Sequence, residues 1–236
     1  MKKIIKLAIT DFKLIFRDSA LRIFLVLPLI IFGLFLWFLP YMIGKYEIIQ
    51  PYLSIFLMVG IIENTQMFSF ISSMVLIDEK ETEVAKTYGV IPLSKVQYVI
   101  SKLLIPFSIT VLLNVVLIEI QVFYQIGWLE NLTISILTAL VVPVYVLGIN
   151  SLVKNRIEGM IYIKVFNMLV LLPLAAFFVP ADYKFLFGVF PVYWVFQIIE
   201  NSTQNLPIMG CAIIGFLFFV VLLIWATIKF IHKHFV

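Results

Sequence analysis

The sequence predicts an all-α, polytopic membrane protein with six transmembrane helices in a single domain over residues 1–236. Of these residues, 63% are hydrophobic and only 13% are charged, whereas a soluble domain is about half apolar and about a quarter charged. Six long runs reach the roughly 17–20 apolar residues that cross a bilayer. These features exclude a soluble enzyme. The net charge of +4 fits the basic inner loops of membrane proteins and does not indicate nucleic-acid binding.

Residues 1–22 are predicted to form an amphipathic helix that lies in the membrane interface. Polar, mostly basic side chains recur at steps of three and four residues, and apolar side chains lie away from them. The polar stripe contains Lys3, Lys6, Thr10, Lys13 and Arg17, and the apolar positions include Ile5, Ala8, Phe12, Ile15 and Phe16. The alternative is a solvated basic tail, but such a tail has no need of phenylalanine and isoleucine at helical spacing.

Six spans are predicted from the apolar runs between charged segments. They cover Ile23–Gly44, Tyr52–Ile77, Val99–Gln125, Leu132–Val153, Ile161–Val179 and Leu206–Ile228. A further apolar run, Phe185–Ile199, reaches only about 22 Å as a helix, short of the roughly 30 Å hydrocarbon core. Residues 181–205 are therefore predicted to form a re-entrant or interfacial segment on the outer side, between spans five and six.

The positions of the basic residues predict the orientation of the chain. With six spans, 15 of the 17 lysine and arginine residues lie on one side, and only Lys45 and Lys184 lie on the other. A seventh span would move Lys229 and Lys233 to the outer side and weaken this bias. Because basic loops stay in the cytoplasm, we expect a multi-pass protein of the plasma or inner membrane with both termini in the cytoplasm.

The link between spans two and three, residues 78–95, is the most charged part of the chain. It also contains apolar residues such as Val84 and Tyr88, followed by Pro92-Leu93-Ser94. This pattern predicts a short helix, a proline-containing turn and a new helix that Ser94 caps. A helix on the cytoplasmic face favours docking of a soluble partner, and a plain connector is the alternative.

The order of these elements resembles the permease subunit of type 2 ATP-binding-cassette exporters. The resemblance rests on Glu79-Lys80-Glu81, followed by Pro92-Leu93-Ser94 and Ser101-Lys102. The Gly-Thr pair that is usual in the family falls on Glu83-Val84 here, which is a departure from the family pattern. Two further segments, Arg156-Ile157-Glu158-Gly159 and Phe190-Pro191-Val192-Tyr193, are similar to permeases that export small drugs, including fluoroquinolones.

The resemblance implies a separate cytoplasmic ATPase and a second permease, which is either an identical copy or a related chain. It also implies that the ATPase grips the link between spans two and three. The residues expected to couple the two proteins are Glu79, Glu81, Tyr88, Pro92 and Ser94.

The chain itself is not expected to bind nucleotide, because no glycine is followed by Lys-Ser or Lys-Thr as in a phosphate-binding loop. The nearest fragment, Gly44-Lys45-Tyr46, lacks the hydroxyl residue. Catalytic, cofactor and metal sites are not expected on this chain, so ATP and Mg²⁺ belong to the partner ATPase.

Polar residues inside the spans are the candidates for a translocation path. The candidates are Glu63, Asn64, Gln66 and Glu119. A carboxylate in lipid is costly, so each of these groups is expected to face a cavity, a partner or the bundle interior. The alternative for both acids is a structural hydrogen bond. By contrast, Asn114, Asn150 and Asn167 are predicted to hydrogen-bond between helices.

The expected cargo is a small amphipathic molecule, a drug, a lipid or a peptide. Two other functions remain open from the residues. One is the substrate-capture subunit of an energy-coupling importer, against which the acidic link argues. The other is a membrane scaffold or immunity protein that transports nothing. Association with an ATPase distinguishes an exporter from a scaffold.

Overall fold

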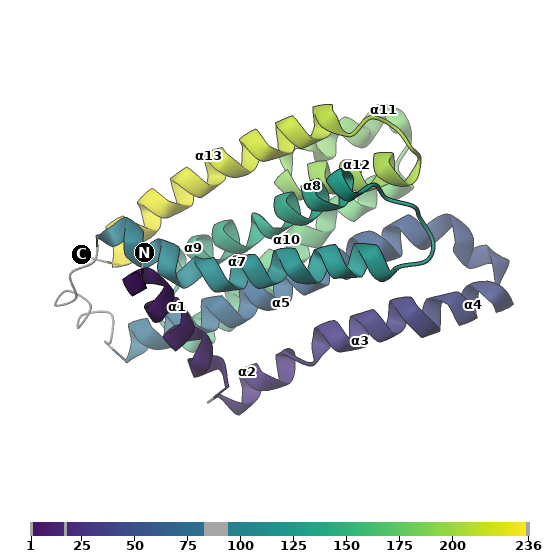
Figure 1. The fold of residues 1–236 in the computed structure, drawn as a ribbon. Coiled ribbons are helices and arrows are strands. Elements are labelled where there is room, and N and C mark those ends of the chain that lie inside the picture. Colours follow the sequence, from purple (N-terminus) through teal and green to yellow (C-terminus); the bar gives the residue numbers. More distant parts are fainter. Residues whose placement is uncertain (1, 17, 83–93, 235–236) are drawn as a thin grey trace.

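The computed structural model describes residues 2–16, 18–82 and 94–234, and these residues form helices and no strand (Figure 1). Within these ranges six helical stretches are long and apolar enough to cross a membrane, which confirms the predicted all-α fold with six spans. They are Leu21–Lys45, Glu47–Glu81, Lys95–Ile120, Trp128–Leu152, Arg156–Phe178 and Met209–Lys233. Helix α1 and the last turns of α13 lie at the same end of the bundle (Figure 1).

The N-terminal region contains two helices instead of the single helix expected over residues 1–22. Helix α1 (Lys2–Ile15) ends before a break, and α2 (Ser19–Phe24) follows. The break has a local cause, because Oδ1 of Asp18 accepts a hydrogen bond from the Leu21 backbone N–H at 3.3 Å and so caps the new helix. The location of α1 in a membrane interface stays a prediction.

The first span continues from α2 through α3 (Leu27–Gly33), the π-helical η1 (Leu34–Phe38) and α4 (Leu39–Lys45). Pro40 has no N–H to bond the carbonyl group of Leu36. Just before Pro40 the backbone hydrogen bonds change to the π-helical pattern, in which the Leu39 N–H bonds to the Leu34 carbonyl group, five residues back.

Helix α5 (Leu53–Glu81) is the central helix, entered through the 3₁₀-helical η2 (Glu47–Tyr52). Its residues are buried around the whole circumference over most of its length, and they include polar residues such as Asn64 and Thr65. It packs against α7 (Lys95–Ile120), α9 (Val141–Leu152) and α10 (Arg156–Leu171).

The fourth span is α8 (Trp128–Ala139) followed by α9, and the two helices meet at Leu140. Pro143 explains the interruption, since it cannot donate to the carbonyl group of Ala139. The fifth span is α10, completed by the 3₁₀-helical η4 (Leu172–Phe178).

The outer segment 181–205 folds into α11 (Ala181–Lys184), the 3₁₀-helical η5 (Phe185–Val189) and α12 (Pro191–Thr203), before α13 (Met209–His234). Helix α12 lies at the end of the bundle opposite α1 (Figure 1) and packs on α13 and α8. Val195, Ile198 and Ile199 of α12 are fully buried. Re-entry of this segment into the membrane stays a prediction.

Gly60 allows α5 to approach the first span and α7 closely. A Cβ atom at this position would lie 2.7 Å from Phe35 Cε2 and 3.2 Å from Leu117 Cδ2. The Phe35 and Leu117 side chains are themselves buried. By contrast, a Cβ atom at Gly44 would meet nothing within 4 Å.

We therefore expect Gly60→Val to lower the thermal unfolding midpoint of the purified protein in detergent by several degrees. Overpacking at such a contact costs about 1–3 kcal/mol. Gly44→Val is the matched control, because it makes the same substitution in a helix at a position where a Cβ atom meets nothing. Equal midpoints for the two variants would contradict the close packing at Gly60.

Candidate functional site: two ion clusters at the end of α5

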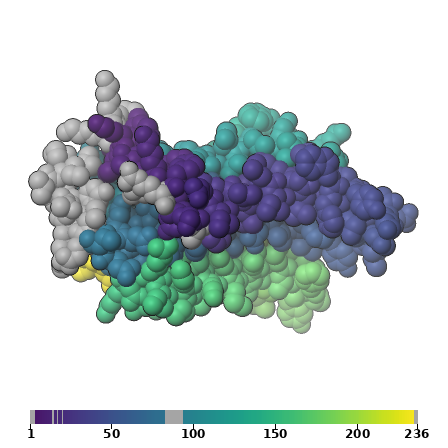
Figure 2. Space-filling model, turned by 90° about the horizontal axis from the view of Figure 1, so that it is seen from below, coloured from purple at the N-terminus to yellow at the C-terminus, as the bar shows by residue number. Residues whose placement is uncertain are grey.

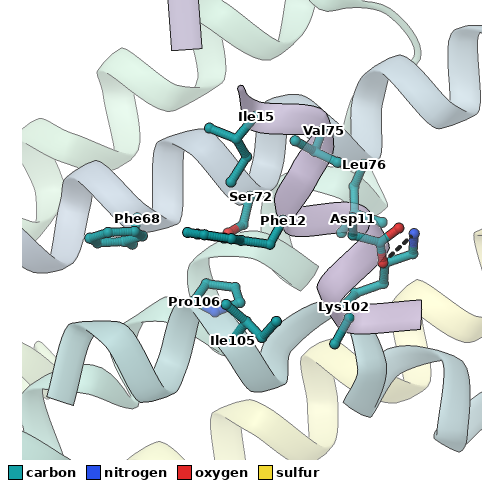
Figure 3. Close-up of a pocket in the computed structure, with 11 residues that line it drawn as sticks. Asp11, Phe12, Ile15, Phe68, Ser72, Val75, Leu76, Lys102, Ile105 and Pro106 are labelled. Carbon is teal, nitrogen blue, oxygen red and sulfur yellow. Dashed lines mark ion pairs between the residues drawn. The ribbon is translucent and has the colours of Figure 1, made fainter. Parts of the chain in front are cut away.

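Three charged side chains from three helices meet at the end of the bundle that carries α1. The ammonium nitrogen Nζ of Lys102 in α7 lies 2.5 Å from Oε1 of Glu79 in α5 and 2.9 Å from Oδ2 of Asp11 in α1. Figure 3 shows Asp11 and Lys102 facing one another. The hydroxyl group of Tyr98 donates a hydrogen bond to the other carboxylate oxygen of Glu79 at 3.1 Å. We call these residues the Lys102 cluster.

All four residues of the Lys102 cluster are buried, with at most 9% of their surface exposed. Buried charges need a partner, because removing an ion from water is costly. Burial raises the pKa of Asp11 from its ordinary 3.8 to about 6, the neighbouring Lys102 opposes this effect, and the charge of Glu79 adds to it. The ammonium group of Lys102 is therefore the counterion for two carboxyl groups.

A second ion cluster lies beside the first and is more exposed. The guanidinium group of Arg156, the first residue of α10, lies 2.9 Å from Oδ2 of Asp18 and 3.4 Å from Oδ2 of Asp78. We call these three residues the Arg156 cluster. Its side chains retain 25–34% of their surface exposed, so each ion pair stabilises the fold only weakly. Asn155 caps α10 and holds Arg156 in place, since its side chain accepts the Glu158 N–H at 2.9 Å.

In both clusters one cation pairs with two acids. In α5, Asp78 pairs with Arg156 of α10, and its neighbour Glu79 pairs with Lys102 of α7. Each of these cations also pairs with one acid of the N-terminal region. Figure 2 shows the N-terminal helices in purple along one face, between the teal residues of the α7 region and the green residues of α10. The last turns of α5 are thus tied by charge to α1, α7 and α10.

Helix α9 is attached to the same turn of α5. The ammonium group of Lys80 donates to the carbonyl oxygens of Val153 at 2.6 Å and Asn150 at 3.4 Å. Three consecutive residues, Asp78, Glu79 and Lys80, therefore hold three different helices.

A small cavity of about 30 Å³ lies between α1, α5 and α7, next to the Lys102 cluster. Phe12 and Ile15 of α1, Ser72 of α5 and Pro106 of α7 line it (Figure 3). A water molecule needs about 10–15 Å³ by this measure, so the cavity has room for about two or three waters and is too small for a cargo molecule.

A larger cavity of about 250 Å³ lies between α9, α10, α12 and α13. Its lining is apolar and aromatic and includes Tyr145, Phe166, Phe219 and Trp225. None of the residues that line it carries a charge, so its walls suit uncharged apolar groups.

The residues predicted to couple to an ATPase occupy different environments. Glu79 is buried and faces Lys102, whereas Glu81, the last residue of α5, is exposed. Ser94 caps α7 as predicted, because its Oγ accepts the Gln97 N–H and the Gln97 side chain accepts the Ser94 N–H. Tyr88 and Pro92, with the predicted short helix, lie outside the described residues.

The candidates inside the spans fall into two groups. Gln66 donates to the Asn167 carbonyl oxygen of α10 at 3.2 Å, and Glu119 accepts from Asn131 of α8 at 3.3 Å. Glu63 is half-buried and makes no hydrogen bond or ion pair with the described residues. Asn64 is fully buried, and both of its amide atoms lack a partner in the described part of the chain.

The predicted interhelical role of the three asparagines is confirmed. The side-chain amide of Asn114 donates to Thr65 Oγ1 at 3.1 Å, and that of Asn150 donates to the Ser73 carbonyl oxygen at 3.5 Å. The side chain of Asn167 accepts from the Tyr145 hydroxyl at 2.5 Å. These bonds connect α5 with α7 and α9, and α9 with α10.

Asp11 and Asp18 were not among the predicted site residues. A signal for Asp11 was present, since it lies three residues after Ala8 and four before Ile15, on the apolar face of its helix. An acid on that face needs a partner when the helix packs. For the Arg156 cluster the sequence holds no comparable signal, because Asp18 and Arg156 are 138 residues apart.

Lys102→Met is expected to destabilise the protein by about 3–5 kcal/mol, because it leaves two buried carboxylates without their counterion. Unfolding by sodium dodecyl sulfate in mixed micelles measures this loss. Lys13→Met, on the exposed face of α1, is the control and should change stability by less than about 0.5 kcal/mol. Similar losses for both variants would show that Lys102 does not neutralise the cluster.

Comparison with known proteins finds one family for nearly the whole chain. Residues 11–227 match the family described as fluoroquinolones export permease protein Rv2686c-like. No curated protein and no solved structure matches the chain. The match covers most of the chain and includes both ion clusters. The chain therefore belongs to the Rv2686c-like family of fluoroquinolone export permeases.

Proposed function

We propose that this chain is the membrane subunit of an ATP-driven exporter of the type 2 ATP-binding-cassette class. A separate cytoplasmic ATPase docks on residues 78–95, and a second permease, identical or related, completes the path. Both termini lie in the cytoplasm. Membership of an export permease family supports this function. The observation that carries the proposed coupling is that Asp78 and Glu79, the first two residues of this segment, are paired with cations of two other helices.

The proposed mechanism is a rigid-body change driven by the ATPase, which binds ATP and Mg²⁺. Because Glu79 and Lys102 hold the ends of α5 and α7 together, a force on the segment between them moves both helices as a unit. The ion pairs to Asp11, Asp18 and Arg156 extend that unit to α1 and α10. Interfaces of this kind switch between discrete arrangements, and ATP binding selects the arrangement to which the ATPase binds more tightly.

The proposed path includes Glu63 and Asn64 of α5. An amide without hydrogen bonds and a half-buried carboxylate are both costly in a membrane interior unless water, cargo or a second subunit contacts them. A carboxylate in the path favours a small amphipathic cargo that is cationic or zwitterionic. Gln66 and Glu119 have partners on neighbouring helices, so their roles are better explained by packing.

We expect Glu81→Gln to reduce the amount of ATPase that co-purifies with the tagged permease. An exposed charge contact is worth about 1 kcal/mol, which is roughly a fivefold change in affinity. Asp182→Asn, an exposed acid at the opposite end of the bundle, is the control and should leave recovery unchanged. Failure of the unmodified permease to recover any ATPase would contradict the exporter and favour the scaffold.

Glu63→Gln is expected to lower export of cationic cargo relative to neutral cargo by roughly fivefold, because it removes one charge contact of about 1 kcal/mol. The measurement is a transport assay in reconstituted vesicles with both subunits. Glu119→Gln is the matched control, because this carboxylate already has a partner in Asn131, and it should leave the cargo ratio unchanged. An unchanged cargo ratio in the Glu63 variant would assign Glu63 a structural role, and ATP-driven uptake in place of export would favour the importer.

A further inference from the structure

Asp11 is the least satisfied acid of the Lys102 cluster. Glu79 is closer to the ammonium group, at 2.5 Å, and also accepts the Tyr98 hydroxyl at 3.1 Å. Oδ2 of Asp11 lies 2.9 Å from the Lys102 ammonium group and has no other donor among the described residues. The two carboxyl groups therefore compete unequally for one cation.

The described cluster contains more negative than positive charge. Two carboxylates face one ammonium group inside a region that is largely closed to water, and excess charge is costly there. A proton on one carboxyl group removes the excess. Because Glu79 is held by two donors, the partner geometry places that proton on Asp11.

We propose that the Lys102 cluster is a proton-binding site, in which a proton on the Asp11 carboxyl group fastens α1 to α5 and α7. The titratable groups that surround Asp11 are Lys102 and Tyr98 on α7 and Glu79 on α5. On α1 itself, Lys6 and Lys13 lie on the exposed face, away from the cluster.

We call α1 seated when it is packed against α5 and α7. Seating is linked to the charge of Asp11 because the acid lies on the packed face of the helix. Ala8 and Ile15, on either side of Asp11, are 2% and 6% exposed, and Phe12 reaches over the small cavity towards α5 and α7 (Figure 3). While these side chains stay in place, only 9% of the surface of Asp11 is exposed. Release of Asp11 into water therefore requires α1 to leave the bundle.

The direction of the pH effect follows from the raised pKa of Asp11. The carboxyl group has a pKa of about 6 when α1 is seated and its ordinary value of 3.8 when it is released. The seated form binds the proton more tightly, so seating weakens as the pH rises from about 4 to about 6 and is constant above that range. With these two values, seating is about tenfold more favourable at pH 5 than at pH 7.

The first experiment titrates Asp11 directly in the full-length permease in lipid nanodiscs. Infrared difference spectra of the unmodified protein minus Asp11→Asn isolate the carbonyl band of the protonated Asp11 side chain, and we expect a midpoint near pH 6. In Glu79→Gln, Lys102 is the counterion of Asp11 alone, so the midpoint should fall by about one pH unit. Asp182→Asn is the control and should leave it unchanged. A midpoint near pH 4, or one that Glu79→Gln does not move, overturns the proposal.

The second experiment measures hydrogen exchange of the α1 backbone amides in the same nanodiscs, with correction for the intrinsic pH dependence of exchange. We expect α1 to be about tenfold better protected at pH 5 than at pH 7. Asp11→Asn should be protected to the same extent at both values. Equal protection of the unmodified helix at both values overturns the link between the proton and α1. Both experiments use the permease alone, so their outcome is independent of ATPase docking.

Discussion

The ion pair between Glu79 and Lys102 is the contact on which the arrangement of this end of the bundle depends. It joins the last turns of α5, where the proposed ATPase docking segment 78–95 begins, to the first turns of α7. The pair is buried, so its strength comes from low exposure to water and from the additional bonds of Tyr98 and Asp11. Such a pair is costly to break because Glu79 without Lys102 would be an uncompensated buried charge. The ends of α5 and α7 are therefore held together.

This constraint gives α5 a double role. Over most of its length it is the buried centre of the bundle, joined to its neighbours by amide and hydroxyl groups such as Thr65 with Asn114. In its last turns the contacts are made by three consecutive charged side chains. They form ion pairs with α7 and α10 and hydrogen bonds with α9, and α1 is joined to them through Lys102. Rigid interhelical bonds inside and ion pairs at one end are suited to transmit a displacement of that end along the whole helix. The chain belongs to a family of export permeases, and we propose that such a displacement is used in export.

Much of the fold could be predicted from the sequence because apolar length and charge asymmetry are local properties. The six spans and the Ser94 cap follow from short stretches of residues. The break at Asp18 and the partner of Glu79 could not be predicted in this way. Glu79 and Lys102 were both visible in the motif that resembles exporters, but a motif does not show which side chains face one another. The sequence therefore suggested a surface role for Glu79, whereas the helix places this carboxylate inside and leaves Glu81 exposed.

A double-mutant cycle on Glu79→Gln and Lys102→Met tests the central claim most directly. Reversible unfolding by sodium dodecyl sulfate in mixed micelles gives the free energy of unfolding for both single variants and the double variant. If the two side chains form the pair that holds α5 to α7, the double variant loses less stability than the sum of the single losses, with a coupling free energy of at least about 1 kcal/mol. Single losses that add to within about 0.5 kcal/mol would contradict the account.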